Sequence, residues 1–376
     1  MKYKNIKIAC IIHSLGIGGM ERVMSILINN FIERENVNIA VLLIGRDRVV
    51  EFKLNDKVEI YKPGFEFNND NRTFSTLKTM FFIRKTIKTI QPDTVLSFGE
   101  IWNNLVLLSL KNIDVPIYIS DRSEPNKDLG ALHNFLRNKL YPSAEGIIAQ
   151  TAHAAELAKK NHRNTNISVI GNPIRDLKLP DVEKDNIVLT VGRLIPTKHV
   201  DQLINVFNDI PKINWKLHIV GGDYNKMKLL NQYKKQVSKL GLDSRVEFFG
   251  QQKNVEKYYA KSKIFAFMST SEGFSNALGE AMRSGCACIA FDCNASSSDM
   301  IEDGINGFLV PSGEYMLFKE KLTLLMNDRS LREEFGQKAK QKMKIFQADK
   351  VSSKFFQVLT GKGNEFSNLI SASFCF

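Results

Sequence analysis

The chain has 376 residues, of which 43% are hydrophobic and 24% are charged, and it carries a formal net charge of +12. Its length exceeds one ordinary hydrophobic core and favours two domains, and its composition is that of a soluble globular protein. No apolar run approaches the roughly 20 residues of a transmembrane helix, and the first residues lack the layout of a signal peptide. We therefore expect a cytoplasmic protein.

The five cysteines are few, odd in number and mostly inside apolar runs, which suits a reducing compartment. Cys286 and Cys288 lack a second cysteine pair or a nearby histidine, so we expect no metal site. The basic charge indicates partners that carry phosphate, such as nucleic acid, anionic lipid or a nucleotide-sugar. The absence of helix-turn-helix, zinc-finger and RNP-type signatures makes nucleic acid the weakest of the three.

The first element is a buried strand over residues 6–12, followed by a glycine-rich turn and a helical pattern over residues 20–28. This order opens a doubly wound α/β fold, and the glycines Gly18 and Gly19 would expose backbone N–H groups to a phosphate. A plain β–α turn is the alternative. The dinucleotide fingerprint requires a small residue where Glu21 stands, which argues against a nicotinamide enzyme.

Further strands are predicted at residues 38–44, 58–61, 94–98, 116–120, 146–150 and 166–170, mostly with helical patterns between them, which indicates a parallel sheet. The helix predicted over residues 72–88 has five basic residues and no acid, together with the apolar residues Phe74, Leu77, Met80, Phe81 and Ile87. A basic amphipathic helix is typical of proteins that bind anionic membranes. The alternative is a packing helix with a solvated basic face.

The loop after the strand at 116–120 contains Asp121, Arg122 and Glu124. Arg122 either binds a phosphate or orders the loop by pairing with Glu124. His13, after the first strand, is the nearest histidine candidate for a substrate contact, and a structural role is its alternative. Residues 173–186, with two prolines and a run of charges, are predicted to be an interdomain linker.

A second α/β unit begins with a strand at 187–191, followed by Gly192, Arg193 and Lys198 at the start of a helix. An arginine fork and a lysine point charge beside a helix N-terminus would bind a diphosphate. Strands at 217–220 and 246–249 end at Gly221 and Gly250-Gln251, and closing strands are predicted at 287–292 and 307–310. Helices are expected over 314–359, and residues 364–376 give no clear pattern.

Between these strands, an apolar run at 264–268 leads into a loop and a helix that ends at Gly285, and the loop and helix start contain Glu272, Gly273, Phe274, Ser275, Asn276 and Glu280. Glu272 would lie at the carboxyl end of a strand and Glu280 on the second turn of the helix. Ligands bind at this edge of open α/β sheets, and a helix N-terminus there favours a phosphate. The two carboxylates can accept hydrogen bonds from sugar hydroxyls.

Two motifs, Gly192-Arg193-Leu194-x3-Lys198 and Glu272-x7-Glu280 with Gly273 and Phe274, resemble those of the retaining glycosyltransferases of family 4, also called glycosyltransferase group 1, of the type that assembles polysaccharides and lipid-linked glycans. The resemblance extends from Ile6 to about Leu359. It implies an α/β GT-B fold with two Rossmann-like domains whose parallel sheets face each other across a cleft. The implied parts are an acceptor domain at 1–172, a linker at 173–186, a nucleotide-sugar domain at 187–345, and a helix at 346–376 that crosses back and ends in a tail.

The resemblance also implies residue roles. The catalytic group is Glu272, Arg193 and Lys198, with the two cations replacing a metal ion at the leaving diphosphate, so no metal cofactor is expected. The donor-binding group is Gly18, Gly19, Gly192, Gly221, Gly250, Gln251, Gly273, Phe274, Ser275, Asn276 and Glu280, in which Glu280 accepts from the ribose. The acceptor or loop candidates are His13, Asp121, Arg122 and Glu124. Many members carry a histidine in the loop at 121–126, where this chain has none and instead resembles a subgroup with an acid–Arg pair.

The resemblance favours a front-face mechanism over Glu272 as a covalent nucleophile, while a simple ion pair of either glutamate with an arginine such as Arg283 is the non-functional alternative. The implied activity is transfer of a hexose or N-acetylhexosamine from a nucleotide-diphospho-sugar, expected to be a UDP-sugar, to a polyprenyl-diphosphate-linked or polysaccharide acceptor of the bacterial surface. We expect the protein at the inner face of the cytoplasmic membrane. The alternatives are a 2-epimerase of the same architecture and a nucleotide-sugar-binding protein without catalysis.

Overall fold

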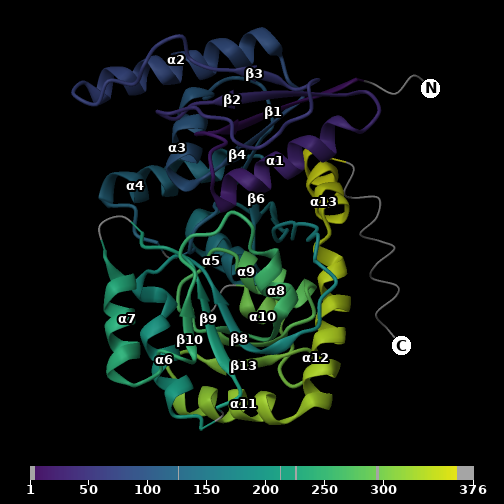
Figure 1. The fold of residues 1–376 in the computed structure, drawn as a ribbon. Helices are drawn as coiled ribbons and strands as arrows, with labels where there is room; N and C mark the ends of the chain where they lie inside the picture. The colour runs from purple at the N-terminus through teal and green to yellow at the C-terminus, as the bar shows by residue number, and fades with distance from the viewer. Residues whose placement is uncertain (1–4, 126, 212, 225–226, 294–295, 362–376) are drawn as a thin grey trace. The chain divides into compact units, whose positions relative to one another are not determined.

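The computed structural model describes residues 5–125, 127–211, 213–224, 227–293 and 296–361. The chain forms two compact units (Figure 1). Unit 1 contains the chain up to Pro173 together with the segment that begins at Ala348, and unit 2 contains Ile174–Gln347. The backbone therefore passes between the units twice. Residues 364–376, for which the sequence predicted no element, lie outside the described residues.

Unit 1 is built on a seven-stranded parallel sheet in the order β3-β2-β1-β4-β5-β6-β7. Its strands are β1 (Ile6–Ile12), β2 (Val37–Leu43), β3 (Glu59–Tyr61), β4 (Thr94–Phe98), β5 (Ile117–Ser120), β6 (Gly146–Ala149) and β7 (Ile167–Val169). Its helices are α1 (Gly19–Ile32), α2 (Arg72–Ile90), α3 (Glu100–Ser109), α4 (Ala131–Leu140), the 3₁₀ turn η1 (Tyr141–Ser143), α5 (Ala152–His162) and α13 (Ala348–Thr360).

The five inner strands of this sheet, β2, β1, β4, β5 and β6, are mostly buried on both faces, which explains their apolar sequences. One core lies between the sheet and the helices α1 and α13, and a second core lies on the side of α2 and α3. Figure 1 shows α13, in yellow, beside α1, in purple. Phe355 of α13 is fully buried against Phe98 of β4, with ring centroids 6.2 Å apart. The helix α13 is thus part of the core of unit 1.

Unit 2 is built on a six-stranded parallel sheet in the order β10-β9-β8-β11-β12-β13. Its strands are β8 (Asp185–Val191), β9 (Lys216–Val220), β10 (Val246–Phe248), β11 (Ser262–Phe267), β12 (Ala287–Asp292) and β13 (Phe308–Pro311). Its helices are η2 (Pro196–Lys198), α6 (Val200–Asn208), α7 (Leu229–Lys239), α8 (Glu256–Lys261), α9 (Asn276–Arg283), α10 (Ser297–Met300), α11 (Tyr315–Asn327), α12 (Arg329–Lys342) and η3 (Met343–Phe346).

The predicted parallel α/β fold is confirmed in both units, and the ends of the predicted strands differ from the observed ones by at most two residues. Each sheet also contains a point where the strand order reverses: β1 lies between β2 and β4, and β8 lies between β9 and β11. The loops at the carboxyl ends of such neighbouring strands diverge to opposite faces and leave a crevice in which α/β proteins bind ligands. Both sequence motifs of unit 2 are at this place.

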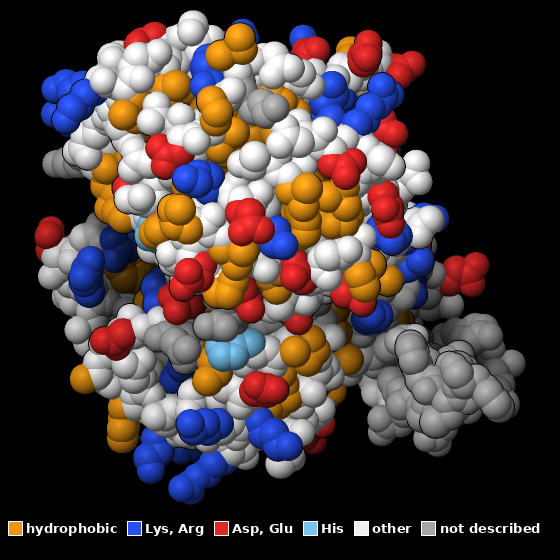
Figure 2. Space-filling model, turned by 90° about the horizontal axis from the view of Figure 1, so that it is seen from below, with side chains coloured by type: hydrophobic (Ala, Val, Ile, Leu, Met, Phe, Trp, Pro, Cys, Tyr) orange, Lys and Arg blue, Asp and Glu red, His pale blue; other side chains and the backbone are white. Residues whose placement is uncertain are grey.

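On the face shown in Figure 2, hydrophobic side chains form small groups scattered among basic and acidic ones, as is normal for folded domains. Among the described residues, no helix combines the length and the apolar character that a membrane crossing requires.

Candidate active site

Three strand ends meet at glycines in unit 2. The Gly192 amide after β8 donates to the carbonyl of Val220 at 3.0 Å, and the Gly221 amide after β9 donates to the carbonyl of Gly250 at 2.9 Å. A Cβ atom on Gly221 would overlap the carbonyl oxygen of Gly192, so only glycine permits this approach. Gly250 has a φ of +62°, and Gln251 follows it on the exposed side, beside Gly222.

Arg193 and Lys198 extend from the segment between β8 and α6. The exposed Arg193 guanidinium lies over the ring of Tyr224, 4.5 Å from its centroid. The partly buried Lys198 ends the 3₁₀ turn η2, and its Nζ lies 5.0 Å from the Phe267 ring centroid and forms an ion pair with Glu272. Both cations line a pocket at the carboxyl ends of β8, β9 and β11, with Gly192, Val220 and Ser269 among its other walls.

The loop that carries Glu272 is fastened to the Lys198 segment. The Thr270 amide donates to the carbonyl of Thr197 at 2.9 Å, and the Thr270 hydroxyl lies 3.1 Å from His199 Nε2. The other ring nitrogen of His199 lies 3.3 Å from the hydroxyl of Tyr315. The sequence analysis missed His199 and Tyr315. These contacts hold the loop of Glu272 next to the turn that ends at Lys198, so that the two charged side chains can pair.

The start of α9 is set by the residues after Glu272. The buried Phe274 packs edge-on against Phe346, with ring centroids 5.7 Å apart, and Gly273 precedes it. The Ser275 amide donates to the Ser296 hydroxyl at 2.6 Å, and that hydroxyl donates back to Ser275 Oγ at 2.8 Å. Asn276 is the first helical residue. The contacts of Phe274 and Ser275 therefore fix the loop and place the first turn of α9 at the edge of the sheet.

Glu280, on the second turn of α9, is 5% exposed. Its Oε1 accepts a hydrogen bond from Arg175 Nε at 2.7 Å, and the same guanidinium lies 3.6 Å from Glu256 of α8. Arg283, the arginine that the sequence analysis considered as an alternative partner, forms an ion pair with Asp176. Glu280 is thus held by Arg175, which lies at the start of unit 2 and is 105 residues away in the sequence.

In unit 1, the glycine-rich turn leads into α1, with Gly18 as the residue before the helix and Gly19 as its first residue. The Glu21 carboxylate folds back against Gly18, where a Cβ atom would collide with it. Glu21 also lies 3.1 Å from Nε2 of His13, whose ring stacks on Trp102 at a centroid distance of 5.7 Å. An acid therefore lies at the helix N-terminus where the sequence analysis expected the donor diphosphate.

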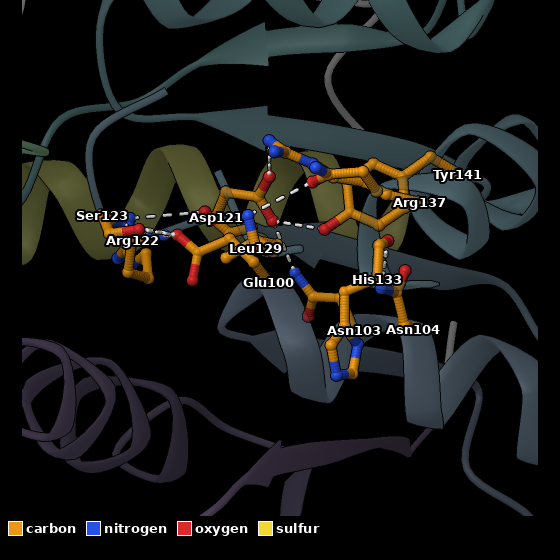
Figure 3. A network of polar contacts seen from close by, with 12 residues as sticks. Glu100, Asn103, Asn104, Asp121, Arg122, Ser123, Leu129, His133, Arg137 and Tyr141 are labelled. Carbon is orange, nitrogen blue, oxygen red and sulfur yellow. Dashed lines mark hydrogen bonds and ion pairs between the residues drawn. The ribbon is translucent and has the colours of Figure 1, made fainter. Parts of the chain in front are cut away.

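Asp121 is the centre of a polar network at the carboxyl end of β5 (Figure 3). One carboxylate oxygen accepts from Asn103 at 2.9 Å and from the Tyr141 hydroxyl at 2.5 Å, and the other accepts from Arg137 at 2.5 Å. Burial raises the pKa of Asp121, while Arg137 opposes the rise. Both oxygens are used by donors from α3, α4 and η1, which suits a residue that fixes this loop.

Arg122 and Ser123 are held by Glu100, the first residue of α3, which the sequence analysis missed. Glu100 Oε1 accepts from the Arg122 amide at 3.0 Å and from the Ser123 amide at 2.7 Å. Burial raises the pKa of Glu100, but the hydrogen bonds from Ser123 and the backbone outweigh it, so that this pKa is lowered. Glu124 is exposed. The carboxylate that orders the Arg122 backbone is therefore Glu100.

The Arg122 side chain packs against two aromatic rings of the unit 1 core. Its guanidinium carbon is 4.0 Å from the centroid of Phe98 and 5.8 Å from that of Phe355. Burial lowers the pKa of Arg122 to about 9. Within the described part of the chain, Nη2 of Arg122 has no hydrogen-bond partner. This nitrogen is a donor held in place by packing.

No group of three or more His, Cys, Asp or Glu residues within the described ranges is arranged to hold a metal ion. The positive groups of the pocket in unit 2 are the two side chains of Arg193 and Lys198. Residues 171–342 match the model of the family described as glycosyl transferases group 1. This span includes both cations and both glutamates. The chain is a glycosyltransferase with a group 1 domain.

Several relatives of this glycosyltransferase match nearly its whole length. It is 25% identical, over 94% of its own length and 98% of the relative's, to the Campylobacter jejuni GalNAc-α-(1→4)-GalNAc-α-(1→3)-diNAcBac-PP-undecaprenol α-1,4-N-acetyl-D-galactosaminyltransferase. Its fold is that of the lipopolysaccharide outer core galactosyltransferase WaaB, with a TM-score of 0.76, 22% identity and coverage of 95% and 100%. Anabaena HepE, solved with UDP and glucose, has a TM-score of 0.73, 18% identity and the same coverage. These neighbours have the GT-B fold.

The side chains that position the site of this glycosyltransferase were less visible in the sequence than those of the motifs. Glu100 follows a glycine directly after a strand, a pattern that places it at the functional edge and offers a weak signal. Arg175 belongs to a segment without periodicity, and no spacing relates it to Glu280. His199 follows Lys198 and has a left-handed backbone conformation with a φ of +49°. The sequence around it predicts an ordinary helix start and gives no sign of this conformation.

Proposed function

We propose that this glycosyltransferase retains the configuration of the sugar and transfers a hexose or N-acetylhexosamine from a UDP-sugar to a lipid-linked or polysaccharide acceptor in bacterial surface glycan synthesis. The observation that carries the proposal is the convergence of Arg193, Lys198 and Glu272 at the carboxyl ends of β8 and β11. Two cations and one carboxylate at that edge match the needs of a sugar diphosphate, because the cations neutralise the phosphates and the carboxylate accepts from sugar hydroxyls.

The proposed chemistry assigns one task to each group. Arg193 and Lys198 stabilise the negative charge that grows on the diphosphate as the bond between sugar carbon 1 and the phosphate oxygen breaks. Glu272, fixed beside Lys198, accepts from the hexose hydroxyls and stabilises positive charge on the sugar. The departing phosphate oxygen takes the proton of the acceptor hydroxyl, whose oxygen bonds to carbon 1 on the same face. Glu280 accepts from the ribose hydroxyls.

The remaining donor contacts are proposed for backbone groups. Gly192, Gly221, Gly250 and Gln251 present main-chain atoms at the strand ends, where the close approach of Gly221 to Gly192 leaves the backbone uncovered by side chains. Gly273 and Phe274 offer their N–H groups just before α9, and Ser275 and Asn276, whose amides already donate to Ser296 Oγ and to the Phe274 carbonyl, are proposed to contact the donor through their side chains. In unit 1, Gly18 and Gly19 are proposed to approach the donor through their backbone, although the Glu21 carboxylate at this turn disfavours a phosphate in direct contact with it.

The choice of substrates is supported by the relatives. HepE was solved with UDP and glucose, which favours a uridine nucleotide, and the C. jejuni enzyme is named for an undecaprenol-diphosphate acceptor. We propose that the acceptor contacts the loop 121–124 and His13 in unit 1. Arg122 is the cation of this loop, which suits an acceptor phosphate, and the exposed Glu124 suits an acceptor hydroxyl, whereas Asp121 and Glu100 order the loop.

We further propose that α2 binds anionic membrane. Phe74, Leu77 and Phe81 are 53%, 56% and 69% exposed on one side of the helix, and the exposed Lys78, Lys85 and Lys88 share that side. Apolar and basic side chains on one stripe match the interface of an anionic bilayer, where each nearby cation contributes about 1 kcal/mol. A lipid-linked acceptor would present its diphosphate at the same level.

A labelled-substrate experiment tests the function. The protein is incubated with radiolabelled UDP-glucose, UDP-galactose, UDP-GlcNAc and UDP-GalNAc, with and without membranes that contain polyprenyl-linked glycans. We expect label to move from one of these donors into the lipid extract only when membranes are present. Conversion of the free nucleotide-sugar into its epimer would identify an epimerase. Tight binding of a donor, without turnover under any of these conditions, would identify a binding protein and contradict the proposal.

A further inference from the structure

The segment that begins unit 2 is attached to α9 by two successive residues. Ile174 is buried against Gly279, where a Cβ atom would collide with the Ile174 side chain. Arg175 then reaches Glu280, one residue further along the helix, at 2.7 Å. The Ile174 amide also donates to the carbonyl of Phe346 at 2.8 Å, close to the point where the chain leaves unit 2. Both connections of unit 2 are therefore fixed next to α9.

Glu280 is buried among groups that leave it little freedom. Arg175 approaches its Oε1 and also lies 3.6 Å from Glu256. The side chain of Tyr259 is a hydrogen-bond partner of Glu280 as well, and burial followed by the Glu280 charge raises the pKa of this tyrosine well above its ordinary value. A buried carboxylate needs a cation or hydrogen-bond donors to remain charged. Arg175 is the cation that the structure places on it.

We propose that Arg175 is a positioning residue, which holds the Glu280 carboxylate in the orientation that accepts hydrogen bonds from the ribose hydroxyls of the nucleotide. This inference rests on the proposed function, in which Glu280 is the ribose ligand. A carboxylate has about four lone-pair sites, so contacts with Arg175 and Tyr259 still leave capacity for the ribose. The guanidinium is planar and always charged, and because Nη1 also lies 3.6 Å from Glu256, the Nε donor is held in a fixed direction toward Glu280. The preference for ribose over deoxyribose then depends on a residue at the junction of the units.

The proposal predicts a loss of ribose discrimination. Dissociation constants of UDP and 2′-deoxy-UDP are measured by calorimetry for the wild-type protein and for Arg175→Gln, Arg175→Lys and Glu280→Gln. We expect the wild type to prefer UDP by about tenfold or more, the range of a hydrogen bond to a charged group. Arg175→Gln should reduce this ratio by about fivefold, the range of one ordinary hydrogen bond. Arg175→Lys, which keeps the charge, should restore part of the ratio.

A matched control removes a neighbouring ion pair between the same two segments. Asp176 is next in the chain and pairs with Arg283 of α9, so Asp176→Asn should leave the ratio at the wild-type value. Melting curves of all variants show whether they fold. A folded Arg175→Gln protein with the full preference for UDP would overturn the role of Arg175. Glu280→Gln with an unchanged ratio would refute the ribose contact of Glu280, whereas a wild type that does not bind UDP would refute the UDP-sugar donor of the proposed function.

Discussion

At the scale of single residues, the central feature is the ion pair between Lys198 and Glu272. Both side chains are more than four-fifths buried, so the pair is less screened than a surface ion pair, which contributes at most about 1 kcal/mol. A donor diphosphate would share Lys198 with Glu272, and the attraction between the two residues would keep the lysine in place. The ion pair would then serve the reaction by aligning the Lys198 charge, and it would contribute little to the stability of the fold.

Lys198→Ala should lower the turnover number by about 100-fold, the effect of losing one preorganised donor to a developing negative charge. The melting temperature should change little, because the pair lies at the edge of the sheet. Lys216→Ala is the control, since Lys216 forms an exposed ion pair with Glu247 in the same unit. Steady-state kinetics with the identified donor decide the matter, and a near-normal turnover in Lys198→Ala would exclude this lysine from the site.

The two glutamates should give different kinetic signatures. Glu280→Ala should mainly raise the donor KM, because a ribose contact exists in both the ground state and the transition state. Glu272→Ala should mainly lower kcat, because its contact strengthens as charge develops on the sugar. Donor titrations of both variants provide the measurement. Identical or exchanged signatures would show that the roles assigned to Glu272 and Glu280 are wrong.

Residue spacing in the sequence was informative where chemistry requires a fixed distance along the chain. Glu272 and Glu280 occupy the loop and the second helical turn, as their spacing predicted. The groups that orient them were not predictable, because Arg175 reaches Glu280 across 105 positions and Glu100 reaches Ser123 across 23. Such contacts depend on the order of strands and on the exact packing of loops, and local patterns contain neither.

At the scale of helices and strands, α5 ends in a histidine whose burial makes the stability of unit 1 depend on pH. Burial lowers the pKa of His162 from 6.5 to about 4, and the charge of Arg137 lowers it as well. The unfolded chain therefore binds a proton at a higher pH than the folded chain does. The contribution of neutral His162 is complete above pH 6.5 and is lost as the pH falls toward 4.

The expected loss at pH 5 is on the order of 2 kcal/mol, from 1.36 kcal/mol for each pH unit below the unfolded pKa. Urea unfolding at pH 7.5 and pH 5 measures it. His162→Phe, which keeps a ring against Tyr141, should reduce the difference between the two pH values. His153→Phe on the same helix should retain it. An unchanged pH dependence in His162→Phe would show that other groups cause it.

The helix α2 illustrates what periodicity does and does not reveal. The sequence showed a helix with basic and apolar residues but could not assign them to faces. In the structure Ile87 is buried, and Arg84 donates to the carbonyls of Ser109 and Lys111 at the end of α3. Of the apolar residues whose direction the sequence left open, Ile87 lies on the side that packs on unit 1. The lysines and the three exposed apolar residues remain on the outer side.

Flotation with vesicles rich in anionic lipid tests the membrane proposal for α2. Lys78, Lys85 and Lys88 are changed together to Gln, and Arg84 is kept because it supports α3. We expect the parent protein to float at low salt, with less binding as salt rises, since exposed charges are screened over roughly 10 Å at about 0.1 M. The triple variant should not float. Lys234, Lys235 and Lys239 of α7, exposed in unit 2, provide the matched control triple, and equal flotation of the two triples would contradict the proposal.

At the scale of the whole molecule, the alternation of strands and helices was sufficient to predict two parallel sheets. Continuous apolar strands separated by amphipathic helices have few other ways to bury both faces. The order of strands within each sheet was not predicted, because it depends on which side of β1 and β8 each crossover takes. The functional edge could still be identified, since the carboxyl ends of all parallel strands lie on one side of the sheet whatever their order.

The placement of α13 in the core of unit 1 has a consequence for biosynthesis. Val351, Phe355 and Leu359 are buried in that core, and each contributes about 1.5–3 kcal/mol of burial. The sum, on the order of 5–9 kcal/mol, is comparable to the whole net stability of a domain. A ribosome delivers α13 only after it has made every residue of unit 2. The unit whose chain begins first is therefore completed last, so the nascent protein carries an unfinished, aggregation-prone sheet throughout the synthesis of unit 2.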